Sequence, residues 1–196
     1  SRIIIADEGG IKNDKTNLIG AHNQINIALA VEVMKIMGLK EKDIKKTITE
    51  YIGEPGRLEL ILKKGGITYY NDTNATTPDA CIAALKTLYK NRKSIVLICG
   101  GAAKELHFEE MIQIIKKTAR AVVLIKGTAT DKIFNILPKG FPKFVITDNM
   151  KSAVQEARNF AQKNDIILLS PGAASFGVFK NEYDRGDQFV KHASRP

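Results

Sequence analysis

Short apolar runs alternate with amphipathic segments through most of the chain. Strands buried on both faces read as continuous apolar runs, and such runs occupy residues 95–99, 121–125, 144–147 and 166–169. Apolar residues recur at helical spacing over 78–89, 108–117, 131–137 and 150–162, and a last helix is expected after Arg185. This alternation predicts a mostly parallel sheet with right-handed crossovers, and therefore a Rossmann-like three-layer α/β domain.

Two further extended segments precede these units. Residues 58–62 and 67–71 flank the pair Gly65-Gly66. A glycine pair between two strand-like segments is typical of a tight hairpin turn. We therefore expect an antiparallel hairpin at the amino-terminal end of the α/β domain.

The first part of the chain follows a helical pattern. Apolar residues recur at helical spacing over 22–38, where Gly38 ends the helix, and a second helix is expected over 41–51. The isoleucines at 3–5 read as a short strand before them.

Residues that interrupt regular secondary structure cluster after the second predicted helix. Gly53, Pro55 and Gly56 interrupt the pattern. We place a domain boundary there, which predicts a helical unit over 1–52 and the α/β domain over 53–196.

Composition narrows the class of protein. The 196 residues are 44% hydrophobic and 26% charged, which excludes a disordered or collagen-like chain. The two cysteines, Cys81 and Cys99, lie in apolar runs and are expected to be buried reduced thiols. No apolar stretch reaches the roughly 18 residues of a membrane span, and no signal peptide opens the chain. We expect a soluble, cytoplasmic protein with no membrane partner. Because the chain begins with Ser1 rather than Met, we interpret it as a piece of a longer protein.

The net charge of +9 needs a separate explanation. Lysine pairs are scattered over several predicted elements, and aromatic residues do not interleave with them as a base-stacking surface requires. Nucleic acid is therefore not an expected partner. A basic surface that favours anionic small molecules, such as nucleotides or carboxylates, fits the pattern better.

Distinctive polar residues follow the predicted strands. In parallel sheets ligands bind at the carboxyl ends of strands, and the segment after residue 70 is unusually rich in short polar residues. Thr77 before Pro78 is typical of a helix N-cap. Capping leaves Asn71, Asp72 and Thr76 unexplained, so a ligand contact from these residues is favoured.

Two glycine-containing loops follow later strands. Gly100-Gly101 lets the main chain approach a ligand, and Lys104 beyond it can meet a carboxylate or phosphate. A plain turn with a surface lysine is an equal alternative, and the spacing does not match a P-loop. The small residues over 170–176, which include Ser175, suit main-chain donors to an anion, or else a tight loop closing the sheet edge. The segment 126–128 reads as a turn and cap.

Two further sets of candidate ligand-binding residues precede the predicted sheet. Asn23 and Asn26 lie in the first turn of the first predicted helix, where capping explains only one of them. Arg57 lies at the domain boundary, where its guanidinium suits a phosphate or ribose, or an interdomain salt bridge.

Read in order, these motifs resemble the Mur ligase family, and within it the branch that adds D-glutamate. The segments that carry the resemblance are Gly20-Ala21-His22-Asn23-Gln24-Ile25-Asn26, Glu54-Pro55-Gly56-Arg57-Leu58-Glu59, Tyr70-Asn71-Asp72-Thr73-Asn74-Ala75-Thr76-Thr77-Pro78, Gly100-Gly101-Ala102-Ala103-Lys104, Ser170-Pro171-Gly172-Ala173-Ala174-Ser175-Phe176 and Phe179-Lys180-Asn181-Glu182-Tyr183-Asp184-Arg185-Gly186. The last two segments are the most specific to that branch, and the first two are shared with folylpolyglutamate ligases.

The resemblance implies an ATP-dependent ligase of peptidoglycan precursor synthesis that uses ATP and Mg²⁺. In such enzymes ATP phosphorylates the carboxylate of UDP-N-acetylmuramoyl-L-alanine, and the amine of D-glutamate attacks the acyl phosphate. Residues 1–52 would end the central ATPase domain, and 53–196 would form the carboxyl-terminal domain.

The resemblance also implies the site residues. Asn23 and Asn26 would approach adenine, and Arg57 and Asp72 would contact ribose or phosphates. The residues implied to hold D-glutamate are Thr76, Lys104 and Ser175. It implies no catalytic residue and no metal ligand in this chain.

Departures from the family pattern keep alternatives open. Gly56 stands where many D-glutamate ligases carry a histidine, and the acidic Glu182 stands where an aromatic residue is common. Another Mur or folylpolyglutamate-type ligase with a different amino acid is one alternative, and a non-catalytic nucleotide-binding module is another. Because the P-loop, the metal-binding segment and the UDP-binding domain are not among these residues, we expect this chain to be inactive by itself.

Overall fold

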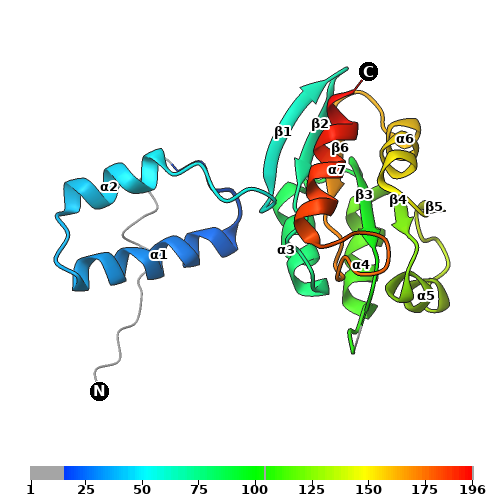
Figure 1. Cartoon of the computed structure of the whole chain (residues 1–196), viewed down its shortest axis with the longest axis horizontal. Coiled ribbons are helices and arrows are strands. Elements are labelled where there is room, and N and C mark those ends of the chain that lie inside the picture. The colour runs from blue at the N-terminus through cyan, green and yellow to red at the C-terminus, as the bar shows by residue number, and fades with distance from the viewer. Residues whose placement is uncertain (1–15, 104, 196) are drawn as a thin grey trace. The chain divides into compact units, whose positions relative to one another are not determined.

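A computed structural model describes residues 16–103 and 105–195 of the protein (Figure 1). The chain divides into two compact units, Ser1–Glu54 and Pro55–Pro196, and each is described here by itself. The strand expected at residues 3–5 lies outside the described residues.

In the described part of the first unit, the helices α1 (Ala21–Ile36) and α2 (Glu41–Glu50) pack against each other. Their shared core consists of Ile27, Ala28 and Val31 from α1 and Ile44 and Ile48 from α2. Between the helices lies Gly38, whose φ of +79° suits glycine. A second apolar stripe on α1, formed by Ile25, Leu29, Val33 and Ile36, is 47–63% exposed. The apolar positions of α1 therefore belong to two faces, of which one is covered by α2.

Among the described residues of the second unit, six strands form one sheet in the order β1-β2-β6-β3-β4-β5. The strands are β1 (Glu59–Lys64), β2 (Ile67–Asn71), β3 (Ile95–Gly100), β4 (Ala119–Ile125), β5 (Lys143–Thr147) and β6 (Ile166–Leu169). β1 pairs with β2 antiparallel around Gly65-Gly66, and the other neighbours are parallel. The expected hairpin and the mostly parallel sheet are confirmed.

Helices cover both faces of the sheet (Figure 1). The core on one face combines strand residues with α3 (Pro78–Leu88), α4 (Glu109–Thr118) and α5 (Thr128–Asn135). The core on the other face combines them with α6 (Met150–Phe160) and α7 (Glu182–Ser194). Successive β3 residues alternate between the two cores, which explains why the strand reads as a continuous apolar run. The three-layer α/β fold is confirmed.

Two helix boundaries differ from the expectation. α5 runs over Thr128–Asn135 rather than 131–137. α7 begins at Glu182, so Arg185 lies inside the helix instead of before it. The Asn181 side chain accepts a hydrogen bond from the Asp184 N–H at 2.9 Å and so caps α7 early.

The cysteines meet the expectation of buried, unpaired thiols. Cys81 and Cys99 are both free and fully buried. Burial raises the pKa of the Cys81 thiol to about 12, so this thiol is held protonated and unreactive.

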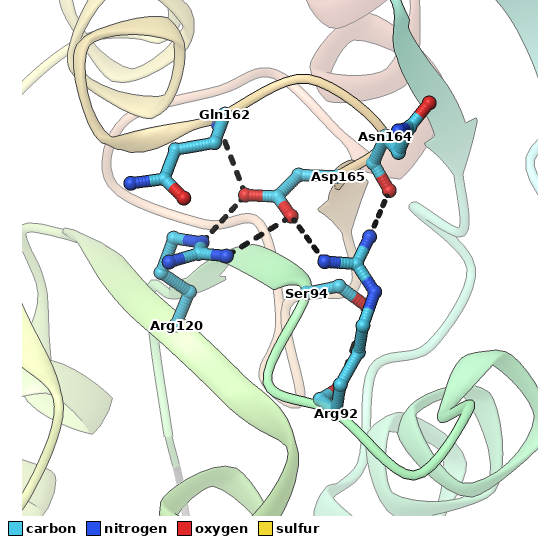
Figure 2. A network of polar contacts seen from close by, with 6 residues as sticks. All are labelled: Arg92, Ser94, Arg120, Gln162, Asn164 and Asp165. Carbon is cyan, nitrogen blue, oxygen red and sulfur yellow. Dashed lines mark hydrogen bonds and ion pairs between the residues drawn. The ribbon is translucent and has the colours of Figure 1, made fainter.

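A buried carboxylate ties the amino-terminal edge of the sheet together (Figure 2). Asp165, with 0% exposure, accepts hydrogen bonds from Arg120 Nε at 2.5 Å and from the Gln162 N–H at 2.9 Å. Arg92 Nη1 lies 3.6 Å from the same carboxylate, and Arg92 also donates to the Asn164 carbonyl. The carboxylate thus joins the start of β4, the segment before β3 and the turn that leads into β6.

Candidate functional site

The carboxyl ends of the five parallel strands lie at one edge of the sheet, opposite Asp165. β6 comes last in the chain yet lies between β2 and β3, so the strand order reverses there. Crevices at such reversals are the usual ligand sites of open α/β sheets. The loops that follow β2, β6 and β3 are therefore neighbours, although they are far apart in the sequence.

Main-chain hydrogen bonds join these loops into one framework. The Gly172 N–H donates to the Ala75 carbonyl at 2.9 Å, which links the loops after β6 and β2. Ala102 and Ala174 exchange two hydrogen bonds, of 3.0 and 2.9 Å, which link the loops after β3 and β6. The positions of the side chains on these loops are therefore set by tertiary contacts.

Asp72 is the central acidic residue of the framework. Its Oδ2 accepts a hydrogen bond from Ser170 Oγ at 2.7 Å, and its Oδ1 accepts one from the Leu58 N–H at 3.0 Å. Burial raises the pKa of this carboxyl to about 6, and the two hydrogen bonds and the charge of Arg57 oppose the rise. The carboxylate is thus held in one orientation and titrates near neutral pH. Ser170 as the partner of Asp72 was not predictable from local sequence, because the two residues are 98 positions apart.

The raised pKa of Asp72 makes the stability of the protein pH-dependent. The folded state binds this proton more tightly than the unfolded state does, with a pKa of about 6 against an ordinary 3.8. The contribution of Asp72 to folding therefore falls as the pH rises through this window. Relative to Asp72→Asn, the wild type is expected to lose about 2 kcal/mol between pH 4.5 and 7.5. Urea unfolding of both proteins at the two pH values measures this, and parallel pH curves would contradict it.

Arg57 lies beside Asp72. Asn74 anchors the preceding segment, because its N–H donates to the Gly56 carbonyl at 3.0 Å and its amide donates to the Pro55 carbonyl at 3.1 Å. Gly56 has a φ of +74°, and a Cβ there would lie 2.7 Å from the Thr73 methyl group, so the position requires glycine. Arg57 is exposed and, within residues 16–103 and 105–195, makes no hydrogen bond or ion pair. Its guanidinium is therefore free to meet a ligand.

The three residues expected to hold an amino acid fall on different loops. Thr76 is half-buried in the loop after β2, and Ser175 is 3% exposed in the loop after β6. Among the described residues, no hydrogen bond engages the N–H groups of Ser175 and Phe176, whereas those of Gly172 and Ala174 bind neighbouring loops. Two of the main-chain donors left unengaged in the 170–176 segment are therefore the adjacent N–H groups of Ser175 and Phe176 at its end. Lys104 lies outside the described residues.

The segment before Lys104 is held by Thr128. Thr128 Oγ1 accepts a hydrogen bond from the Ala103 N–H at 2.9 Å and donates to the Ala103 carbonyl at 3.2 Å. The cap expected within residues 126–128 is confirmed, because Gly127 is the N-cap of α5, while Thr128 is the first residue of the helix and its hydroxyl makes no cap bond. Thr77 does cap α3, as expected, by accepting from the Ala80 N–H.

The two asparagines of α1 belong to the first unit. Asn23 donates its amide to the Ile19 carbonyl at 2.8 Å, and Asn26 donates to Asn23 Oδ1 at 3.4 Å. The expectation that one of them caps the helix is wrong, because Gly20 occupies the N-cap without a side-chain bond. Both asparagines are oriented by one short chain of hydrogen bonds.

Arg185 is a residue of the site that the sequence did not reveal. It is 0% exposed and donates three hydrogen bonds, to Thr73 Oγ1, to the Thr73 carbonyl and to the Ala173 carbonyl. Burial lowers the pKa of its guanidinium to about 10, and Glu182 opposes this shift. The guanidinium therefore remains charged at neutral pH beneath the loops.

The described residues offer neither a cluster of metal ligands nor a membrane-spanning helix. In the part of the chain that the structure describes, no group of three or more His, Cys, Asp or Glu side chains is placed to hold a metal ion. Nor is any helix there both long and apolar enough to span a membrane.

Comparison with known proteins places these loops in context. The family profile described as "Mur ligase, glutamate ligase domain" matches residues 56–172. The UDP-N-acetylmuramoylalanine--D-glutamate ligase of Roseiflexus sp. (strain RS-1) is 42% identical over 179 residues, which cover 90% of this chain and 38% of that protein. The enzyme of the same name from Pelotomaculum thermopropionicum is 35% identical, over 91% of this chain and 38% of its own length. The chain thus spans about two fifths of the curated relatives it matches.

Solved structures share the fold. A folylpolyglutamate synthase of Mycobacterium tuberculosis, complexed with ADP and AMPPCP, matches with a TM-score of 0.69 and 15% identity, over 94% of this chain and 43% of that one. The UDP-N-acetylmuramate-alanine ligase MurC of Thermotoga maritima matches with a TM-score of 0.67 and 17% identity, over 91% of this chain and 39% of that one. At these identities the likeness concerns the fold.

Proposed function

The chain belongs to the Mur ligase family, and from this premise we propose that it is the carboxyl-terminal portion of an ATP-dependent ligase that adds D-glutamate to UDP-N-acetylmuramoyl-L-alanine. The observation that carries the proposal is the 42% identity over 90% of the chain to a ligase of that name. The proposal places the enzyme in peptidoglycan precursor synthesis in the cytoplasm.

The loops at the carboxyl ends of β2, β3 and β6 support a role in binding D-glutamate. A dianionic amino acid requires a cation and several fixed donors. The N–H groups of Ser175 and Phe176, together with Thr76, supply donors on two loops that are hydrogen-bonded to each other. We assign the cation to Lys104, which follows the segment that Thr128 holds.

Arg57 and Asp72 support a role in binding the nucleotide. A free guanidinium suits a phosphate, and a carboxylate fixed by Ser170 and the Leu58 N–H keeps lone pairs for a ribose hydroxyl. We assign Asn23 and Asn26 to the adenine. ATP supplies the phosphoryl group that activates the substrate carboxylate, and in this proposal these residues orient it without taking part in the bond changes.

The described residues do not by themselves fit a magnesium site. No cluster of three or more potential ligands occurs among residues 16–103 and 105–195. The proposal therefore assigns Mg²⁺ to a part of the ligase outside these residues, and no step through the ion is derived from this chain.

We further propose that residues 1–52 end the central ATPase domain and that 53–196 form the carboxyl-terminal domain. The exposed stripe of Ile25, Leu29, Val33 and Ile36 on α1 supports the first assignment. An apolar helix face of this kind is normally buried against another element of the same domain. In this proposal the rest of the ATPase domain covers the stripe, and the isolated chain is inactive because the reacting groups are divided among domains.

The experiment is an amino-acid panel. The complete ligase that contains this chain, supplied with ATP, Mg²⁺ and UDP-N-acetylmuramoyl-L-alanine, is expected to release phosphate with D-glutamate and at least about 100-fold less with L-glutamate, L-lysine or diaminopimelate. Preference for another amino acid would favour the alternative ligase, for which Glu182 near the amino-acid loops is the supporting observation. Amide formation by the 196-residue chain alone would contradict its proposed inactivity.

A further inference from the structure

Arg185 carries a buried charge without an ion-pair partner. Its side chain is fully buried, and in the described part of the chain no carboxylate lies within ion-pair distance of its guanidinium. Glu182, one turn earlier on α7, acts on it only through its charge. Burying an unpaired cation is costly, and an apolar side chain of similar size would fill the space without that cost. Packing alone therefore does not explain an arginine at this position, and the explanation must lie in its charge or its hydrogen-bond donors.

The hydrogen bonds of Arg185 go to two ligand loops. Nε donates to Thr73 Oγ1 at 3.1 Å, and Nη2 donates to the Thr73 carbonyl at 2.7 Å. Two donors therefore bind the residue that follows Asp72. Nη1 donates to the Ala173 carbonyl at 3.0 Å, two residues before Ser175. Because the guanidinium is planar and its donors are fixed relative to each other, it sets the distance and angle between the two loops.

Close packing leaves α7 little freedom to shift. A Cβ on Gly186 would lie 2.8 Å from the Thr73 methyl group, so the helix main chain lies directly against the loop after β2. A Cβ on Gly101 would lie 3.9 Å from Arg185 Nη1, which brings the loop after β3 to the same guanidinium. Arg185 therefore lies at the junction of three loops.

We propose that Arg185 is the positioning residue of the amino-acid site, where it locks the loops after β2 and β6 in one arrangement and lends its uncompensated charge to the binding of an anion. The inference rests on the proposed function only for the identity of that anion, D-glutamate. Loop fixation and charge are separable by substitution. Arg185→Lys keeps the positive charge but loses the planar arrangement of guanidinium donors. Arg185→Gln keeps two N–H donors but loses the charge.

Hydrogen exchange of the 196-residue chain tests loop fixation without any ligand. In Arg185→Lys the Gly172 and Ala174 amides, which bind neighbouring loops, are expected to exchange about 10-fold faster, the equivalent of one lost hydrogen bond. Arg158→Lys is the matched control, because Arg158 also donates to carbonyls of α7, those of His192 and Ala193, at the other end of the helix. Equal exchange of the two amides in both variants would overturn the positioning role.

Kinetics of the complete ligase test the charge. Arg185→Lys is expected to raise the KM for D-glutamate about 10-fold with a smaller change in kcat, and Arg185→Gln to raise it about 10-fold more because an ionic contribution is also lost. Arg158→Lys should leave this KM unchanged. Equal KM values for the lysine and glutamine variants would overturn the charge role. A ligase that does not accept D-glutamate would refute the proposed function, whereas the exchange result would still decide loop fixation.

Discussion

Replacing Asp165 by asparagine is expected to lower the free energy of unfolding by about 3–4 kcal/mol. Asparagine has nearly the same volume, so the loss reports on charge and not on packing. Arg120 would keep a positive charge, 28% exposed, against a neutral amide, and one of its two hydrogen bonds to the carboxylate would have no acceptor (Figure 2). The Gln162 N–H and Arg120 Nε already share Oδ2, so with the amide oxygen at that place the amide NH2 group would face Arg120 Nη2 and Arg92 Nη1. The fully buried carboxylate thus stabilises three segments at once.

Arg92→Gln is the control for this prediction. Its side chain is 49% exposed and its nitrogen lies 3.6 Å from the Asp165 carboxylate, so the pair is solvent-screened. Such a pair contributes about 1 kcal/mol or less. Urea unfolding of the wild type and both variants at pH 7 gives the comparison. Similar losses for the two variants would contradict a stabilising role specific to the buried carboxylate.

The layers of the fold were predictable from the sequence because burial on one or both faces of an element produces a recognisable local pattern of apolar residues. β3 alternates between two cores, and residues 95–99 therefore read as one apolar run that only a strand covered on both faces explains. The start of α7 was missed although Asn181 is a good N-cap residue, since the Arg185-Gly186 pair reads as the end of a loop. Gly186 lies within the helix because any side chain there would meet Thr73.

The candidate site was predictable only in part, because several of its contacts join residues that are far apart in the sequence. Asp72 and Arg57 stand out locally, as polar residues after a strand and at a boundary. Ser170, Thr128 and Arg185 act through partners 98, 25 and 112 residues away in the sequence. Nothing in the sequence near these residues indicates such partners, because the contacts arise only when the sheet places β6 beside β2 and β4 beside β3 and α7 packs against them. What sequence patterns miss here is therefore the set of residues that support the candidate site.

Replacing Gly101 by alanine is expected to reduce turnover by the complete ligase about 100-fold, since displacement of a substrate-holding group by about 1 Å has effects of this size. Gly101 has a φ of +122°, and a Cβ there would lie 2.5 Å from the Ala174 carbonyl oxygen. Neither main chain can yield without separating Ala102 from Ala174, whose paired hydrogen bonds join the loops after β3 and β6. The substitution would therefore move the loop that leads to Lys104 away from the loop that carries Ser175.

Gly65→Ala separates this steric effect from backbone strain. Gly65 also has a positive φ, +60°, yet a Cβ there meets no atom within 4 Å, and it lies in the β1–β2 hairpin rather than on the ligand loops. Its substitution is expected to cost about 1 kcal/mol of stability and to leave turnover unchanged. Steady-state phosphate release by both variants, at saturating D-glutamate and at temperatures well below their unfolding transitions, makes the comparison. Because both alanines are strained and only one collides with a neighbouring loop, equal turnover would show that contact between the two loops is not required for the reaction.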